Sequence, residues 1–570
     1  MSGFTFEDIE SLSVDLPEDI AKRKWHGDFK GADRLIGLWL KKDIPENLRK
    51  KLALEREILK RLPSEYPYTY REAVAKLQEP VPDLTEEEFR AFQDQGKIDW
   101  IYVEGEEKFF ERFVETLLKV DLPIMERAAR ARENKERADR ACAENVKAVK
   151  AQGGAGDTGN RLPETLQNPA ERIAAETEQA PAGRIGAETE QASAGRIGAE
   201  TVQAPAGRIR AETAQNPSEF FSGESERPTE ERSLRENTQP PVSREKQALL
   251  DVIRQIREEG KAEYRFQIRA SLRIKEESFQ KGSVTVHIPV PAKSPQLRDI
   301  RILAVSSETY EAASADSSQR AVCFREDMQE NHDFWVEYSY VNRVDYVEMK
   351  PEEVQPVNPA EYEEDLREQL PHIRFTPYMR ELAGRLTEGL ENPLEKARSI
   401  YDYITTHVEY AFVRNYFTIE NLAEYAAVGG RGDCGIQALM FITLCRIAGV
   451  PARWQSGLYT TPYSAGCHDW AQVYIAPYGW RYVDCSFGGS ARREGDEERR
   501  KFYFGNLDPF RMVANSRFQQ EFDVKKSFLR ADPYDNQRGE AEYEDKGLGF
   551  EDFIWKAEIQ ACDALTEDFQ

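Results

Sequence analysis

Three residues of the types that catalyse acyl transfer occur in order late in the chain. They are Cys434, His468 and Asp484, separated by 34 and then 16 residues. A cysteine attacks as its thiolate, so it needs a base, and a histidine base needs a partner that orients its ring. The residue types and their order therefore indicate a nucleophile, a base and an orienting carboxylate.

The sequence predicts that Cys434 begins a buried helix. Apolar residues recur at helical spacing from Ile436 to Ile447, and Gly449 follows as a stop signal. A helix N-terminus offers partial positive charge and free N–H groups, which favour a thiolate and can hold an oxyanion. The adjacent Asp433 acts in the opposite direction, because a nearby carboxylate disfavours the thiolate.

His468 and Asp484 lie on a predicted β-hairpin. Side chains alternate in character from His468 to Ile475 and from Trp480 to Asp484, on either side of a turn at residues 477–479. Both residues then lie near the open end of the hairpin. We expect them to be close, although the sequence does not fix the register of the strands.

The segments that carry these residues resemble the transglutaminase-like superfamily. The matching motifs are Gly432-Asp433-Cys434, Leu444–Arg453, His468-Asp469-Trp470 and Gly479–Asp484. The resemblance covers about residues 376–504. It implies a papain-like core with Cys434, His468 and Asp484 as its catalytic triad, and a β domain ahead of such a core is common in bacterial members.

Two cysteines depart from the family pattern and raise the question of a metal. Cys467 precedes the histidine, and Cys485 stands where proline is frequent. A zinc site made of Cys434, Cys467, His468 and Cys485 is the rival chemistry. No C-x-x-C pair supports it, and neighbours on a strand point to opposite faces. We therefore expect no metal and no bound cofactor.

Two further features are left open or predicted only coarsely. The side chain that completes an oxyanion hole could come from Tyr410, Asn415 or Tyr416, which precede the cysteine. Residues 533–547 are polar, so they are predicted to lie on the surface.

Composition limits the classes of function. The chain has 570 residues and a net charge of −24, so nucleic acid is a disfavoured partner. No apolar run is long enough to suggest a membrane span. The first 15 residues lack the order of a signal peptide, and seven cysteines are too sparse for a disulfide framework. These features favour a cytoplasmic protein with free thiols.

The expected fold class is α+β with several domains. Period-two alternation between residues 261 and 357 predicts a small antiparallel sandwich. An Arg-Ile pair recurs every twelve residues from Arg172 to Ile209, in a segment read as a disordered linker or else as a repeated docking motif. The expected division is 1–150 helical N-terminal region, 151–243 low-complexity linker, 244–260 connecting helix, 261–357 antiparallel β domain, 358–530 transglutaminase-like catalytic core and 531–570 C-terminal extension.

The predicted function is thiol-dependent acyl transfer on peptide or protein amides through a thioester. Hydrolysis by a cysteine protease or amidase is favoured, because no Ca²⁺ loop with the required acidic spacing is present and an uncontrolled cytosolic cross-linker would be hazardous. Protein-glutamine gamma-glutamyltransferase activity and an inactive, partner-binding scaffold are the alternatives, since the fold does not choose the reaction. The expected partners are a peptide or protein substrate and a protein bound by the N-terminal region.

Overall fold

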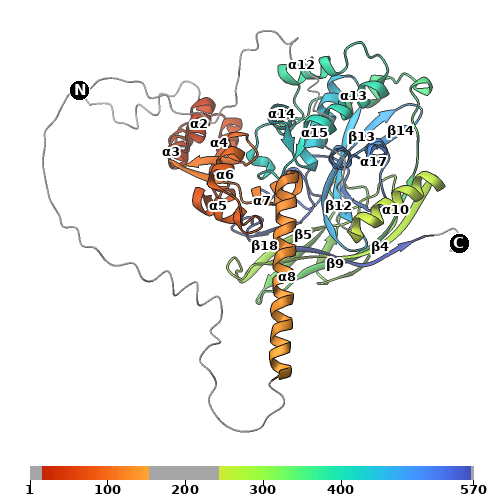
Figure 1. Cartoon of the computed structure of the whole chain (residues 1–570). Coiled ribbons are helices and arrows are strands. Elements are labelled where there is room, and N and C mark those ends of the chain that lie inside the picture. Colours follow the sequence, from red (N-terminus) through yellow and green to blue (C-terminus); the bar gives the residue numbers. More distant parts are fainter. Residues whose placement is uncertain (1–15, 153–242, 566–570) are drawn as a thin grey trace, which may run out of the picture. The chain divides into compact units, whose positions relative to one another are not determined.

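The computed structural model describes residues 16–152 and 243–565 (Figure 1). Met1–Asp139 and Val242–Gln570 together form one compact unit, and Arg140–Pro241 clusters separately. The predicted twelve-residue repeats lie outside the described residues. Within the described ranges, no helix combines the length and the apolar character needed to cross a membrane.

The N-terminal region consists mainly of short helices with well-formed starts. Thr69 and Thr85 each begin a helix with a capping box, in which Glu72 or Glu88 returns the hydrogen bond. The helices are α2 (Leu16–Trp25), α3 (Phe29–Leu40), α4 (Glu46–Arg61), α5 (Tyr70–Gln78), α6 (Glu86–Asp94), α7 (Phe113–Val120) and α8 (Leu122–Gln152), with a 3₁₀ turn η1 (Leu62–Glu65) after α4.

A small antiparallel sheet in the same region was not predicted. Its strand order is β1–β3–β2, formed by β1 (Tyr68–Thr69), β3 (Glu106–Phe109) and β2 (Trp100–Val103). Strands of two to four residues are too short to show a period of two, so alternation does not predict them. Apolar residues of the first helices, including Leu35 and Ile36, belong to the same buried cluster as the helices of the catalytic core.

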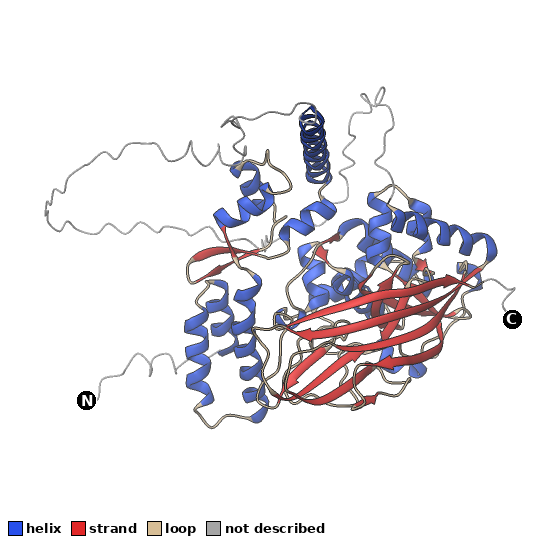
Figure 2. Ribbon diagram, turned by 90° about the horizontal axis from the view of Figure 1, so that it is seen from below, coloured by secondary structure: helices blue, strands red, loops and turns tan. Residues whose placement is uncertain are grey.

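The β region contains two four-stranded antiparallel sheets around one apolar cluster. Figure 2 shows the long strands side by side. One sheet has the order β17 (Glu540–Tyr543), β5 (Gly282–Pro289), β8 (Ala321–Met328), β7 (Tyr310–Ala312), and the other β18 (Phe553–Ala564), β4 (Lys261–Ile274), β9 (Phe334–Asp345), β6 (Leu297–Val305). The helix α10 (Arg244–Glu259), capped by Ser243, precedes β4 and adds its apolar face to the cluster.

The C-terminal segment is part of these sheets, because it supplies β17 to one and β18 to the other. The prediction that residues 533–547 lie on the surface is wrong for much of the segment. Glu540 is 1% exposed and pairs with Lys526 at 2.9 Å. Its carboxylate also accepts hydrogen bonds from the backbone N–H groups of Ala531 and Asp532. Polar residues can be buried when every group has a partner, and composition does not reveal partners.

The region predicted as the catalytic core packs helices against a five-stranded sheet. Its helices are α11 (Glu363–Leu366), α12 (Pro377–Leu386), α13 (Pro393–His407), α14 (Leu422–Gly429), α15 (Cys434–Ile447), α16 (Cys485–Arg493) and α17 (Glu497–Phe502), with 3₁₀ turns η3 (Pro351–Glu353), η4 (Pro359–Tyr362) and η5 (Tyr416–Thr418). The sheet order is β15 (Phe504–Gly505), β14 (Gly479–Val483), β13 (Ala465–Ile475), β12 (Ala452–Thr460) and β16 (Arg511–Asn515), and a separate parallel pair joins β10 (Glu409–Tyr410) to β11 (Arg431–Gly432).

Helix α15 is the central element of the core. It is apolar on all sides and buried from Gly435 to Arg446, as expected for a helix surrounded by other elements. Asp433 caps its N-terminus by accepting a hydrogen bond from the Ile436 N–H at 3.1 Å. The predicted helix start is therefore correct, and Cys434 is its first residue.

The two faces of β13 pack against different parts of the molecule. Ala471, Val473 and Ile475 belong to the apolar cluster that contains α15. Trp470 belongs instead to the cluster of the β region. Because neighbours on a strand point to opposite faces, this division separates the surroundings of His468 from those of Asp469.

Removing Glu540 should reveal how much the C-terminal segment depends on its buried ion pair. We expect Glu540→Ala to destabilise the protein by about 3–5 kcal/mol, because the buried Lys526 would lose its carboxylate and keep only its hydrogen bond to the Ala541 carbonyl. Asp316→Ala is the matched control, since its pair with Lys293 is exposed and should be worth at most about 1 kcal/mol. Unfolding of the full chain by denaturant measures both, and equal losses would contradict the expectation.

Candidate active site

Cys434 lies at the N-terminus of α15, and its thiol is bonded to a carboxyl group. The Sγ atom donates a hydrogen bond to Oδ2 of Asp469 at 3.3 Å. Burial raises the pKa of the Cys434 thiol well above its ordinary value, and the carboxyl groups of Asp469 and Asp433 raise it further. In this conformation Cys434 is therefore a neutral thiol, despite its position at a helix N-terminus.

The carboxyl group of Asp469 is itself in an unusual environment. Oδ1 accepts a hydrogen bond from Gln537 Nε2 at 2.6 Å, and Asp535 lies beside it. Burial and the neighbouring charge of Asp535 raise the pKa of Asp469 well above the usual range. Two buried carboxyl groups cannot both ionise at low cost, so the pair of Asp469 and Asp535 favours a state in which one of the two keeps its proton.

Asp433 acts mainly as a cap in the structure. Its Oδ1 atom accepts hydrogen bonds from the Ile436 N–H and from the hydroxyl of Tyr416, the latter at 2.6 Å. Burial raises the pKa of Asp433 to about 6, although these two donors oppose the shift. The sequence alone does not determine where the Asp433 side chain points. In the structure it points to the N-terminus of α15 and caps it.

The structure brings His468 and Asp484 together. His468 Nε2 lies 2.7 Å from Oδ2 of Asp484, and Nη1 of Arg511 lies 3.1 Å from the same oxygen. The other oxygen accepts hydrogen bonds from Ser486 Oγ and the Phe487 N–H. Burial alone would raise the pKa of Asp484, but the imidazole, the guanidinium and these donors lower it to about 2. Asp484 is thus a fixed, buried anion.

The imidazole of His468 is oriented as a base with one nitrogen free. Burial lowers its pKa, so the ring is neutral near pH 7 even though Asp484 favours the charged form. With Nε2 donating to the carboxylate, the lone pair is on Nδ1, which makes no hydrogen bond within the described residues. The rings of Trp470 and Phe487 hold the imidazole, at centroid distances of 6.0 and 4.9 Å.

The three residues predicted as a triad are therefore not joined as one chain of hydrogen bonds. In the part of the chain that the structure describes, no hydrogen bond links Cys434 to His468, and the thiol is bonded to Asp469 instead. The contact of Asp469 with the thiol is not predicted from the sequence. One signal was present, because Asp469 is the polar member of the strand face that otherwise carries Ala471, Val473 and Ile475.

The oxyanion candidates differ in their availability. The Tyr416 hydroxyl is occupied by Asp433. The backbone N–H of Asn415, as distinct from its side-chain amide, donates to Glu65 Oε2 at 2.6 Å. Tyr410 makes no side-chain hydrogen bond within the described residues. Burial and the nearby Cys434 raise the pKa of its hydroxyl well above the ordinary value, so it stays a donor. Tyr410 is thus the candidate with a free hydroxyl beside the nucleophile.

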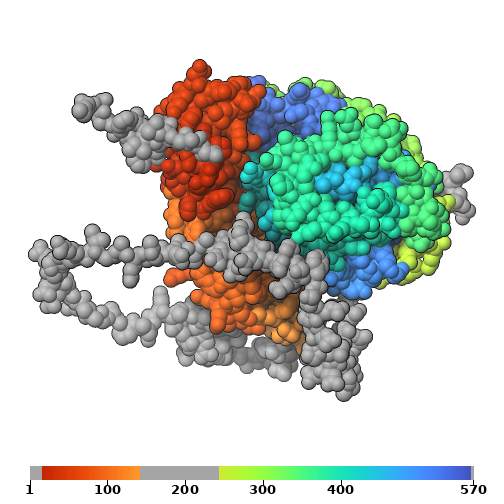
Figure 3. Space-filling model, turned by 90° about the horizontal axis from the view of Figure 1, so that it is seen from above, coloured from red at the N-terminus to blue at the C-terminus, as the bar shows by residue number. Residues whose placement is uncertain are grey.

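Residues of the N-terminal region cover the segment beside the nucleophile. Figure 3 shows this region, coloured red to orange, against later parts of the chain. Thr116 Oγ1 of α7 accepts a hydrogen bond from the Phe412 N–H at 3.2 Å, and Arg112 stacks on the Phe412 ring at 3.5 Å. Lys119 Nζ lies 4.0 Å from the ring of Tyr410. The sequence analysis assigned no chemistry to this region.

The four residues considered for zinc are placed differently from one another. Cys485 begins α16 and is buried, and His468 Nε2 is bonded to Asp484. Cys467 lies beside the guanidinium of Arg538. Among the described residues, no group of three or more His, Cys, Asp or Glu side chains is arranged to hold a metal ion.

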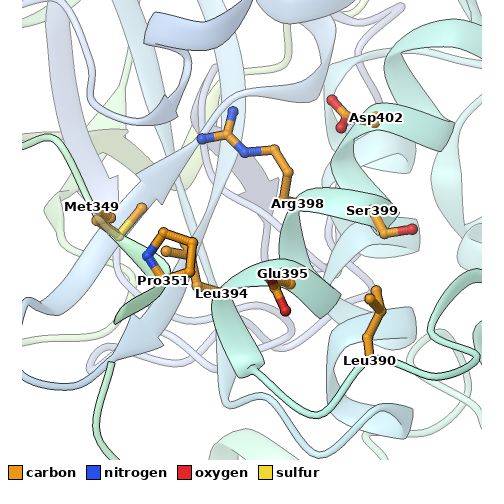
Figure 4. A pocket seen from close by; sticks show the side chains of 8 residues that line it. All are labelled: Met349, Pro351, Leu390, Leu394, Glu395, Arg398, Ser399 and Asp402. Carbon is orange, nitrogen blue, oxygen red and sulfur yellow. The ribbon is translucent and has the colours of Figure 1, made fainter. Parts of the chain in front are cut away.

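One cavity of about 400 Å³ lies away from these clusters (Figure 4). Arg398, Ser399 and Asp402 project into its lining from α13. It shares no residue with the surroundings of Cys434 or His468. Its lining residues are Met349, Pro351, Leu390, Leu394, Glu395, Arg398, Ser399 and Asp402.

Comparison with known proteins confirms the resemblance found in the sequence. Residues 380–485 match the family model of the Transglutaminase-like superfamily. No curated protein sequence matches the chain.

Two solved structures illustrate the likeness. A protein of Cytophaga hutchinsonii described as a candidate cysteine protease is 16% identical, with 54% of this chain and 93% of that chain covered and a TM-score of 0.36. The periplasmic domain of TgpA from Pseudomonas aeruginosa is 12% identical, with 41% and 92% covered and a TM-score of 0.23.

Replacing Asp469 tests whether it keeps the thiol neutral. We expect Asp469→Asn to lower the pKa of the Cys434 thiol, because the carboxyl group of Asp469 is one of the groups that raise it. The rate of alkylation by iodoacetamide, followed at Cys434 by mass spectrometry across pH, measures this pKa. Cys445, buried in the same helix, is the internal control and should keep its profile. An unchanged or higher pKa at Cys434 would refute the role.

Proposed function

We propose that this chain is a thiol-dependent enzyme that cleaves peptide or protein amides through a thioester on Cys434. The transglutaminase-like match of residues 380–485 supports a thiol enzyme of this broad kind. The observation that carries the proposal is the buried pair of His468 and Asp484, whose geometry leaves Nδ1 as a free base. Such a pair is costly to bury, and it orients an imidazole as catalysis requires.

The proposed reaction begins when the thiol leaves the carboxyl group of Asp469. His468 Nδ1 takes the thiol proton, and sulfur attacks the carbonyl carbon of the amide. The N–H groups that begin α15 and the Tyr410 hydroxyl stabilise the oxyanion. The C–N bond then breaks as the imidazolium returns the proton to the leaving amine, and Asp484 stabilises the charged ring while it exists.

Water is the proposed acceptor of the thioester. His468 activates it in the second step, which releases a carboxylic acid and regenerates the thiol. The absence of an acidic Ca²⁺ loop from the sequence is the reason to favour hydrolysis over cross-linking. Transfer to an amine would use the same residues, so it is an outcome that the experiment must separate.

One observation favours a second candidate, a scaffold without catalysis. The thiol of Cys434 is neutral and bonded to Asp469, and a thiol in that state is a poor nucleophile. If Cys434 always remained bonded to Asp469, the core would bind partners without catalysing a reaction.

Hydrolysis of a peptide library by the purified full chain, read by mass spectrometry, tests the proposal. Cys434→Ser should abolish cleavage, and His468→Gln should reduce kcat at least about 100-fold, as expected for loss of a general base. His332→Gln is the matched control, because that histidine is half-exposed in the β region and bonded to Glu326. It should leave the rate unchanged.

The other outcomes are distinct. Incorporation of an amine into glutamine peptides without any hydrolysis would replace the proposed reaction by transfer. A third outcome is that no peptide is cleaved and that Cys434 reacts like an ordinary buried thiol in both the wild type and His468→Gln. That outcome would favour the scaffold without catalysis.

A further inference from the structure

A second cavity, of about 410 Å³, is built from three distant parts of the chain. The N-terminal region, the catalytic core and the C-terminal segment each contribute to it. Its lining residues are Arg112, Phe412, Gly466, Cys467, Arg538, Phe550, Phe553 and Trp555. A cavity of this size is within the range of pockets that bind small molecules or single side chains.

The cavity lies next to the candidate nucleophile. Cys467 lines it, and Asp469, which accepts the Cys434 hydrogen bond, lies two residues further along the same face of β13. That spacing is about 7 Å along a strand. On the other wall, the Phe412 ring contacts the ring of Tyr410 at 5.5 Å between centroids. A substrate held by Cys434 could therefore place an adjacent group in this cavity.

The polar groups of the cavity are donors. Arg538 forms no ion pair with a carboxylate within the described residues, and its guanidinium lies 5.0 Å from the Phe550 ring. Glu111 and Asp532 are close enough to contribute favourable charge to Arg538 without pairing with it. The indole N–H of Trp555 is buried and has no partner within the described residues.

The remaining lining residues add no acidic side chain to the cavity. Arg112 is bonded to Glu115 and stacked on Phe412, and no lining residue is acidic. The cavity thus contains one guanidinium, that of Arg538, without a bonded carboxylate within the described residues, in a chain whose net charge is −24. A guanidinium beside aromatic walls matches a carboxylate better than it matches a neutral amide, because charge-assisted hydrogen bonds are the stronger ones.

We propose that this cavity binds a carboxylate of the peptide substrate, so that the enzyme selects acidic peptides. Arg538 provides the charge, and the indole of Trp555 and the three phenylalanine rings pack against the carbon chain of the bound group. The substrate class rests on the proposed function. The carboxylate could belong to a Glu or Asp side chain or to a free C-terminus, and the test separates these sources.

Cys467 provides a measurement of occupancy that does not depend on catalysis. In the full chain carrying Cys434→Ser, the rate of Cys467 alkylation by iodoacetamide is followed by mass spectrometry while a peptide is added. The three probes share one sequence: an acetylated, amidated peptide containing Glu, the same peptide with Gln in its place, and the Gln peptide with a free C-terminal carboxylate.

The Glu peptide should protect Cys467 at concentrations at least about tenfold lower than the Gln peptide, the factor given by one charge-assisted hydrogen bond. Protection by the third peptide instead would assign the site to C-terminal carboxylates. Arg538→Gln should remove the preference. Arg301→Gln, an exposed arginine on β6, is the matched control and should leave it intact.

Equal protection by all three peptides, or a preference that survives Arg538→Gln, would overturn the proposal. Circular dichroism of each variant shows whether a loss of protection reflects loss of the fold, and Arg538→Lys, which keeps the charge, should then retain part of the preference. Protection of Cys467 by acidic peptides that the wild type does not cleave would leave the pocket in place and refute the proposed hydrolysis, so the two failures are distinguishable.

Discussion

The buried contact between Arg511 and Asp484 joins β16 of the five-stranded sheet to the residue that caps α16. Arg511 is fully buried, 3.1 Å from Asp484 and 2.9 Å from Asp508, and its guanidinium packs against the rings of Tyr459 and Phe487. An unpaired charge in this position would be very unfavourable, so these groups must be assembled together. The same contact fixes Asp484 as an anion and thereby orients His468. Folding and the readiness of the base thus depend on one cluster.

The two faces of β13 place opposite electrostatic demands on the candidate site. On the face toward the β region, a fixed cation and a fixed anion surround a neutral imidazole. On the face toward α15, buried carboxyl groups surround the thiol and keep it protonated. A thiolate is stable only when the first environment outweighs the second. Whether Cys434 is a thiol or a thiolate therefore depends on whether its side chain lies nearer to Asp469 or to His468. The N-terminus of α15 lies beside it in both positions.

The sequence by itself determined the elements that carry the chemistry. The Asp433 cap, the apolar period and Gly449 predicted α15 with Cys434 at its first residue, because caps and periodicity are local properties. Alternation predicted β13 and β14 as a hairpin, and proximity of His468 to Asp484 followed from their shared end. The family motifs predicted the same segment that the family model matches. The caps, the periodicity and the alternation used for these predictions each lie within a single helix or a single hairpin.

Only the tertiary structure decided which groups meet. It paired the thiol with Asp469, placed Arg511 on Asp484 and buried the polar C-terminal segment in the sheets. It also joined Arg112, Cys467 and Arg538 around one cavity, from three segments that are distant in the chain. Local patterns cannot encode such contacts, since the packing of whole elements sets which faces are apposed. The free energy of a buried charge depends on partners that are distant in the chain, and for that reason the electrostatics of the site became visible only in the folded molecule.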